Sequence, residues 1–262
     1  MAAEWNQASI ERAADFIWRA HRDGARFANL PPDIAPATVD QAYDVQEAFH
    51  RRMSPIAGPI GGLKIATTTK VMQQLMGIDH PCGGAIFASR IHAAPVDLAL
   101  SDFVHVVAEC ELAVRLGRDL ADDGPISREW AMGAVADVAP AFELVEDRHA
   151  DYRNTKALTL IADNAWNVGI VHGRWCKFDP AAVTAEIQGV LAIDGAERGR
   201  GRLDDPFGAL AWVAMLAVQR KRPLKAGMVV ITGSVVPTFP LSSGNDVSFR
   251  LDPWGETRMR LG

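Results

Sequence analysis

Two glutamates in one apolar segment are the residues whose type and spacing most strongly indicate chemistry. Glu109 and Glu111 stand two residues apart in the segment 103–116, whose even-numbered positions are all apolar. Side chains two residues apart on a β-strand point to the same side of the sheet, so the two carboxylates stand together. Because Phe103 and Val107 share that face, it is not uniformly solvated, and a half-buried pair of like charges needs a cation.

A third glutamate lies in comparable surroundings, since Glu143 shares its face of the segment 140–146 with Ala141 and Val145. Three carboxylates supply the oxygen ligands that Mg²⁺ or Mn²⁺ prefers, and they leave coordination positions for water or substrate. Zinc is disfavoured because the chain has no HExxH motif and none of its seven histidines stands two or four residues from another. The alternative is that these glutamates lie on the solvated outer face of a strand.

The composition favours a globular, cytoplasmic protein without a nucleic-acid or membrane partner. Of the 262 residues, 48% are hydrophobic and 23% are charged, and the net charge is -5 with no basic stripe for a polyanion. The three cysteines lack a CxxC spacing, which argues against a disulfide framework and a thiolate zinc site. The most apolar run, 209–218, is shorter than the roughly 20 residues that span a bilayer, and the first residues contain no apolar signal segment.

The elements that must position the carboxylates are helical at first. Ser9 is expected to cap a helix that Gly24 ends. Thr38 and Gln41 form a capping box ahead of a second amphipathic helix. We therefore expect a helical lobe over residues 1–75.

Strand patterns dominate the rest of the chain. The predicted segments are a strand over 61–67, a short helix over 69–76, extended chain over 85–94, and strands over 103–116, 140–146, 167–173, 183–193, 228–231, 247–251 and 257–261. One late helix interrupts them, with Asp205 at its N-cap and Pro206 in its first turn. This order predicts an α+β fold with a largely antiparallel β domain over residues 76–262.

Six short blocks carry a resemblance to a known family. They are Gly-Leu-Lys-Ile (62–65), Met-Gly-Ile-Asp-His-Pro (76–81), the pair Glu109 and Glu111 followed by Leu-Gly-Arg-Asp-Leu (116–120), Pro-Ala-Phe-Glu-Leu-Val-Glu-Asp-Arg (140–148), Ala-Asp-Asn (162–164) and Thr-Gly-Ser (232–234). Each block is weak alone, but their order and spacing are specific and extend over most of the chain. The sequence resembles the 2-keto-4-pentenoate hydratase and 4-oxalocrotonate decarboxylase branch of the fumarylacetoacetate hydrolase superfamily.

The resemblance implies a fold, a metal and an assembly. It implies a mixed β roll with an N-terminal helical lobe, and a homo-oligomer built from dimers, which could also form a complex with a pathway enzyme. It assigns Glu109, Glu111 and Glu143 as the ligands of Mg²⁺ or Mn²⁺.

The resemblance also implies residues that act on the substrate. Lys64 is the candidate acid or base, although an exposed lysine is the alternative, and Asp79 is a second candidate that could instead be a turn residue before Pro81. The expected substrate-binding residues are Asn164, Thr232 and Ser234.

The implied reaction is the metal-dependent hydration of a 2-hydroxy-2,4-dienoate to a 4-hydroxy-2-oxo acid, in aromatic catabolism. A 4-oxalocrotonate-type decarboxylase is the alternative enzyme, because the same chelate would stabilise the dienolate left by CO₂. Three positions depart from the family pattern: Cys110 replaces a proline, Trp166 replaces a serine, and Asp205 replaces a histidine. The changes at Trp166 and Asp205 keep open a third hypothesis, a non-catalytic partner subunit of an active paralogue.

Overall fold

The computed structural model describes residues 5–121, 124–184 and 186–262. The elements in chain order are α1 (Gln7–Arg22), α2 (Val39–Ala57), β1 (Ile60–Ala66), α3 (Lys70–Met76), β2 (Cys82–Phe87), η1 (Ala88–Arg90), β3 (Ile91–Ala93), β4 (Val96–Leu98), η2 (Leu100–Asp102), β5 (Val106–Leu116), α4 (Arg128–Gly133), β6 (Val135–Glu146), α5 (Ala157–Ala162), η3 (Asn164–Trp166), β7 (Asn167–His172), β8 (Cys176–Lys177), η4 (Pro180–Ala182), β9 (Gln188–Ile193), β10 (Ala196–Arg202), α6 (Pro206–Gln219), β11 (Val229–Pro240), β12 (Asp246–Leu251) and β13 (Glu256–Leu261). Among these helices, none is both long and apolar enough to cross a membrane.

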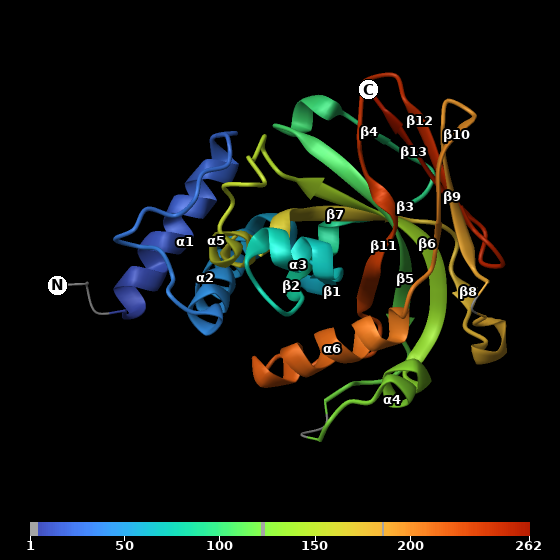
Figure 1. The fold of residues 1–262 in the computed structure, drawn as a ribbon, viewed down its shortest axis with the longest axis horizontal. Coiled ribbons are helices and arrows are strands. Elements are labelled where there is room, and N and C mark those ends of the chain that lie inside the picture. Colours follow the sequence, from blue (N-terminus) through green and yellow to red (C-terminus); the bar gives the residue numbers. More distant parts are fainter. Residues whose placement is uncertain (1–4, 122–123, 185) are drawn as a thin grey trace.

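Within the described residues the strands form two sheets. The larger has eight strands in the order β2-β1-β11-β5-β6-β7-β3, with β8 also paired to β6, and the smaller has five in the order β10-β9-β12-β13-β4. The pairs β1–β11, β3–β7 and β4–β13 are parallel and the remaining pairs are antiparallel. Helices α1, α2 and α5 lie together on one side of the curled sheets (Figure 1). The expected α+β fold with a mixed, largely antiparallel β body is confirmed.

The division at residue 75 remains a prediction, and the first part of the chain contains helices together with the strand that the pattern over 61–67 predicts. Helices α1 and α2 pack on each other through a small apolar core that includes Ile17, Val45 and Phe49. Strand β1, however, follows α2 directly and pairs with β2 and β11 in the large sheet. The first part of the chain therefore supplies a strand as well as helices.

One predicted cap is wrong and the others hold. Helix α1 begins after Asn6, whose Oδ1 accepts a hydrogen bond from the backbone N–H of Ser9 at 3.2 Å, so Ser9 lies inside the first turn. Thr38 caps α2, because its Oγ1 accepts from the N–H of Gln41 at 3.2 Å. Asp205 caps α6 in the same way.

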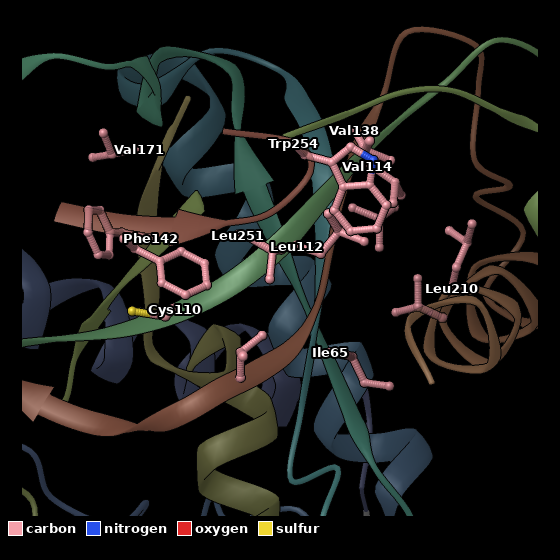
Figure 2. Packing of buried hydrophobic residues seen from close by; sticks show 14 of the residues in the cluster. Ile65, Cys110, Leu112, Val114, Val138, Phe142, Val171, Leu210, Leu251 and Trp254 are labelled. Atoms are coloured by element: carbon pink, nitrogen blue, oxygen red, sulfur yellow. The ribbon is translucent and has the colours of Figure 1, made fainter. Parts of the chain in front are cut away.

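The two faces of β5 have different environments. Its even-numbered side chains enter the main apolar core, where Cys110 and Leu112 lie with Phe142 and Leu251 (Figure 2). Cys110 is fully buried there, as its even position predicts. The core between the sheets therefore fixes which side of β5 faces it, and the odd-numbered glutamates must face the other side.

Several strand boundaries differ from the prediction. The segment predicted over 103–116 begins as a strand at Val106, and the one predicted over 183–193 begins at Gln188. Strand β10 was not predicted, because it alternates charged residues with glycine and lacks an apolar period. It lies close against β11: a Cβ at Gly201 would be 1.7 Å from the carbonyl oxygen of Val235, so glycine is required.

His50 on α2 gives the fold a pH-dependent contact. It is buried, and its Nε2 lies 2.8 Å from the Oδ1 of Asn164, to which the neutral ring donates. Burial lowers the pKa of His50 from 6.5 to about 4, although the hydrogen bond to Asn164 opposes the shift. Since the folded-state pKa is the lower one, the stability that neutral His50 contributes is complete above pH 6.5 and is lost as the pH falls towards 4.

We therefore expect the free energy of unfolding of the wild type to fall relative to a His50→Gln variant by about 3 kcal/mol between pH 7 and pH 4. Glutamine keeps a donor for Asn164 but does not titrate. Urea unfolding at both pH values measures the difference. Parallel pH dependences for the two proteins would contradict this account.

Candidate metal centre and active site

The three predicted glutamates converge. On the antiparallel pair β5–β6, Glu109 and Glu143 are direct cross-strand partners, and Glu111 follows two residues later on the same face. One oxygen from each of the three carboxylates lies within 4.8 Å of the others. Glu111 and Glu143 are fully buried, whereas Glu109 is partly exposed, so the group opens to solvent on the Glu109 side.

Two of these carboxylates are each held through one oxygen by β11. The Oε2 of Glu111 accepts a hydrogen bond from the backbone N–H of Gly233 at 2.7 Å. The Oε1 of Glu109 accepts from the Oγ1 of Thr238 at 2.6 Å. The other oxygen of Glu111, Oε1, has no hydrogen-bond donor among the described residues.

Glu143 is held in the same way by two donors. Its Oε1 lies 2.9 Å from the Nζ of Lys64 on β1 and accepts from the Nδ2 of Asn167 on β7 at 2.9 Å. Lys64 also donates to the carbonyl oxygen of Ala165 at 3.3 Å. The ammonium group is therefore fixed at the edge of the carboxylate group rather than free in solvent.

The remaining oxygens fit a cation. Within the part of the chain that the structure describes, Oε1 of Glu111 and Oε2 of Glu143 are buried and have no hydrogen-bond donor. A buried acceptor without a partner is costly, and a carboxylate oxygen more so. Two orphaned oxygens that converge with Glu109 are the donor set that a hard divalent ion takes.

The electrostatics agree with this fit. Burial raises the pKa of Glu111 well above its usual value, and the carboxylates of Glu143 and Glu109 raise it further. Burial also raises the pKa of Glu143 to about 7, although Lys64 lowers it. One ammonium thus fails to compensate for three carboxylates, and a bound cation would supply the missing charge.

Lys64 is buried and positively charged. Burial opposes its charge, but the carboxylates of Glu143 and Glu109 outweigh burial and raise its pKa above the usual value. The side chain therefore holds its proton next to the site. This geometry excludes the exposed lysine considered from the sequence.

The segment that faces Lys64 has an unusual backbone. Asn164, Ala165 and Trp166 all have positive φ values, of 54°, 44° and 60°. Such conformations are strained for residues other than glycine and persist only where the surroundings enforce them. Here the strain aims the carbonyl oxygen of Ala165 at Lys64.

Asn164 holds this segment in place. Its Oδ1 accepts from the backbone N–H of Ala85, and its Nδ2 donates to the carbonyl oxygens of Ala85 and Asn167. The side chain thereby pairs with β2 as a strand would. A Cβ at Gly84 would be 2.6 Å from the carbonyl oxygen of Asn164, so this close approach needs glycine. The hydrogen-bonding groups of Asn164 are thus engaged by the protein, and its role in substrate binding stays a prediction.

The other expected residues lie in different settings. Thr232 is buried and donates to the carbonyl oxygen of Leu112 at 2.9 Å, and Ser234 is exposed and donates to the carbonyl oxygen of Val236 at 2.6 Å. Asp79 is exposed between α3 and β2. Their roles in substrate binding and proton transfer also stay predictions.

Sequence reasoning missed three donors of the site. They are the N–H of Gly233, the hydroxyl of Thr238 and the amide of Asn167. The block 232–234 indicated the hydroxyl groups of Thr232 and Ser234, but not the backbone N–H of the glycine between them. No short motif marks Thr238 or Asn167, because only the register of β11 and β7 brings them to the glutamates.

Comparison with known proteins identifies a family for this chain. Residues 86–261 match the family described as the fumarylacetoacetate (FAA) hydrolase C-terminal domain. The chain is 31% identical to 2-keto-4-pentenoate hydratase 1 of Dechloromonas aromatica, over 94% of this chain and 95% of that protein, and 29% identical to the TodF product hydratase of Pseudomonas putida, over 93% and 91%.

A solved structure shares the fold over the whole chain. The 4-oxalocrotonate decarboxylase from Pseudomonas putida G7, complexed with magnesium and adipate, superposes with a TM-score of 0.90 at 21% identity, covering 99% of both chains. Glu109, Glu111 and Glu143 all lie within the residues that match the family. The chain belongs to the fumarylacetoacetate hydrolase family.

Proposed function

We propose that the protein is a divalent-metal-dependent hydratase that adds water to a short 2-hydroxy-2,4-dienoate and forms a 4-hydroxy-2-oxo acid. One observation carries the proposal: three carboxylates converge beside a buried ammonium group, and among the described residues two of them keep a buried oxygen without a hydrogen-bond donor. The names of the relatives, which are hydratases of such acids, support the same reaction class.

Glu109, Glu111 and Glu143 would hold the ion. Bound there, a divalent cation supplies a Lewis acid that polarises the C2 oxygen of a chelating 2-oxo acid and stabilises enolate charge. Mg²⁺ and Mn²⁺ both suit three carboxylates. Restoring each metal in turn to the chelator-treated protein tests which of the two ions supports turnover.

Lys64 is suited to act as the proton donor. Its ammonium group is fixed by Glu143 and the carbonyl oxygen of Ala165. A proton delivered to C5 of the dienol, with loss of the proton on the C2 hydroxyl, gives the 2-oxo-3-enoate; water then adds at C4 and C3 takes a proton. Asp79 remains the second proposed proton carrier. General acid catalysis of this kind requires a donor held within hydrogen-bonding reach of the substrate.

Decarboxylation of a 4-oxalocrotonate-type acid is the second candidate. It is favoured by the close superposition on a decarboxylase, which shows a shared fold, and the same chelate would stabilise the dienolate that CO₂ leaves behind. The two reactions differ in the distal end of the substrate, because only the decarboxylase substrate carries a second carboxylate. We further propose a homo-oligomeric assembly, which this site does not require.

The first prediction concerns the glutamates. Glu111→Gln should abolish Mn²⁺ binding and reduce the rate of dienoate hydration by at least about a hundredfold, because it removes a ligand and a charge. Without metal, the variant should be at least as stable as the wild type, since burial opposes the charge of Glu111. Titration calorimetry, loss of the ultraviolet band of 2-hydroxypenta-2,4-dienoate, and thermal melts measure these effects.

Glu197→Gln is the matched control, because Glu197 is exposed on β10. It should leave metal binding and rate unchanged. Full activity of Glu111→Gln would remove the metal assignment.

Metal removal gives a second prediction. Treatment with a chelator should stop turnover, and Mg²⁺ or Mn²⁺ should restore it. Added metal should stabilise the fold, by about 2.7 kcal/mol at a hundredfold excess over Kd. Thermal melts at graded metal concentrations test this. Metal-dependent stabilisation without turnover of any dienoate would instead favour the non-catalytic subunit.

Thr238 provides a third prediction. Thr238→Val keeps the shape of the side chain but removes the hydroxyl that orients Glu109, so the affinity for Mn²⁺ should fall about tenfold to a hundredfold. Thr238→Ser, which keeps the hydroxyl, should bind almost as the wild type does. Calorimetric titration of both variants is the measurement, and equal affinities would show that Thr238 does not position Glu109.

A further inference from the structure

The backbone places Trp166 next to the proposed catalytic groups. The carbonyl oxygen of Ala165 accepts a hydrogen bond from Lys64 at 3.3 Å, and Trp166 is the next residue. Trp166 itself has a left-handed backbone conformation, with φ of 60°. A bulky residue in this conformation is a strained choice, and such strain concentrates at functional sites.

The sheet places the same side chain at one end of the metal group. Trp166 packs with Val107 and Val145, which are cross-strand partners on β5 and β6. Glu109 and Glu143 are the next partners on that face, two residues further along each strand, which is a distance of about 7 Å. The apolar cluster that contains the indole therefore lies about 7 Å from Glu109 and Glu143, along the direction of the strands.

The surroundings of the indole are apolar and closed. The ring of Trp166 makes edge contacts with Phe27 and Tyr152, at centroid distances of 5.1 and 5.3 Å. The other members of this apolar cluster come from α3, α5 and the two strands: Met72, Met76, Val107, Val145, Ala157 and Leu160. A substrate end placed here would meet hydrocarbon rather than water.

The indole N–H of Trp166 is free to donate a hydrogen bond to a ligand. It is buried and, among the described residues, has no hydrogen-bond partner. A buried tryptophan that serves only packing usually finds a partner for this group. A single neutral donor can satisfy one ligand oxygen, such as the hydroxyl that hydration places on C4, but it leaves the charge of a carboxylate uncompensated.

Trp166 and its apolar neighbours form what we call the wall of the site, and the charged groups near this wall also disfavour binding of a second carboxylate. Lys64 is paired with Glu143, and Arg148, whose guanidinium lies over the ring of Phe27, is paired with Asp163 through Nη2. The buried Nε and Nη1 of Arg148 have no hydrogen-bond partner among the described residues. Tyr152 at the edge of the wall donates to an acid, Asp147, at 3.0 Å. Against the indole itself, an anionic substrate end would meet only a neutral donor, which leaves its charge uncompensated.

We propose that Trp166 is the residue that determines specificity at the distal end of the substrate. It limits the enzyme to short monocarboxylic 2-hydroxydienoates and excludes acids with a second, distal carboxylate. This inference rests on the proposed function, and it favours hydration over decarboxylation for this chain.

The test is a series of unreactive 2-oxo acids bound to the Mg²⁺-loaded protein, measured by calorimetry. For the wild type, affinity should rise from pyruvate to 2-oxopentanoate and then fall for 2-oxoheptanoate, and 2-oxoadipate should bind at least about tenfold more weakly than 2-oxohexanoate. Trp166→Leu should bind 2-oxoheptanoate about tenfold more tightly than the wild type does, with pyruvate unchanged. Trp166→Phe is the matched control, because it keeps an aromatic wall and should keep the length limit.

The same comparison is made in turnover, as the ratio of kcat/KM for 2-hydroxypenta-2,4-dienoate to that for a longer alkyl homologue. Trp166→Leu should shift this ratio towards the longer substrate. An unchanged length preference in Trp166→Leu, or tighter binding of 2-oxoadipate than of 2-oxohexanoate by the wild type, would overturn the inference. The wild-type series decides even if Trp166→Leu does not fold. If the wild type shows the length limit in binding but hydrates no dienoate, the proposed hydratase activity is wrong and the proposed role of Trp166 stands.

Discussion

The site depends on an imbalance of charge that the protein builds into its sheet. Three carboxylates converge, two of them fully buried, and the ammonium group of Lys64 lies against one of them. Burial raises the pKa values of Glu111 and Glu143, so the folded chain opposes their ionisation. Such a group is tolerable when a cation completes it, because a metal ion takes the oxygens that find no donor in the protein.

The fold places this costly group where the backbone is best supported. Strands β5, β6 and β11 are neighbours inside the large sheet, and each glutamate rises from a strand with partners on both sides. On β5 the same alternation that buries Cys110 and Leu112 in the core turns Glu109 and Glu111 to the other face. Packing energy on one side of the strand thus fixes the direction of the ligands on the other.

A short strained segment joins the proposed catalytic group to the proposed substrate wall. Residues 164–166 keep left-handed conformations because the side chain of Asn164 is hydrogen-bonded to β2 and Gly84 permits the close approach. The segment directs the carbonyl oxygen of Ala165 to Lys64 and places the indole of Trp166 in the apolar cluster with Val107 and Val145. One local constraint therefore positions both the proposed proton donor and the residue that we infer to limit substrate length.

The sequence by itself determined the parts that follow from local periodicity. Alternation along 103–116 placed Glu109 and Glu111 on one face, and capping residues located α2 and α6, because these signals need only neighbours in the chain. Only the tertiary structure decided which donors hold the carboxylates. Thr238 and Glu109 are 129 residues apart, and Gly233 and Glu111 are 122 apart, so their hydrogen bonds depend on the register between β11 and β5, which carries bulges that no local pattern reveals.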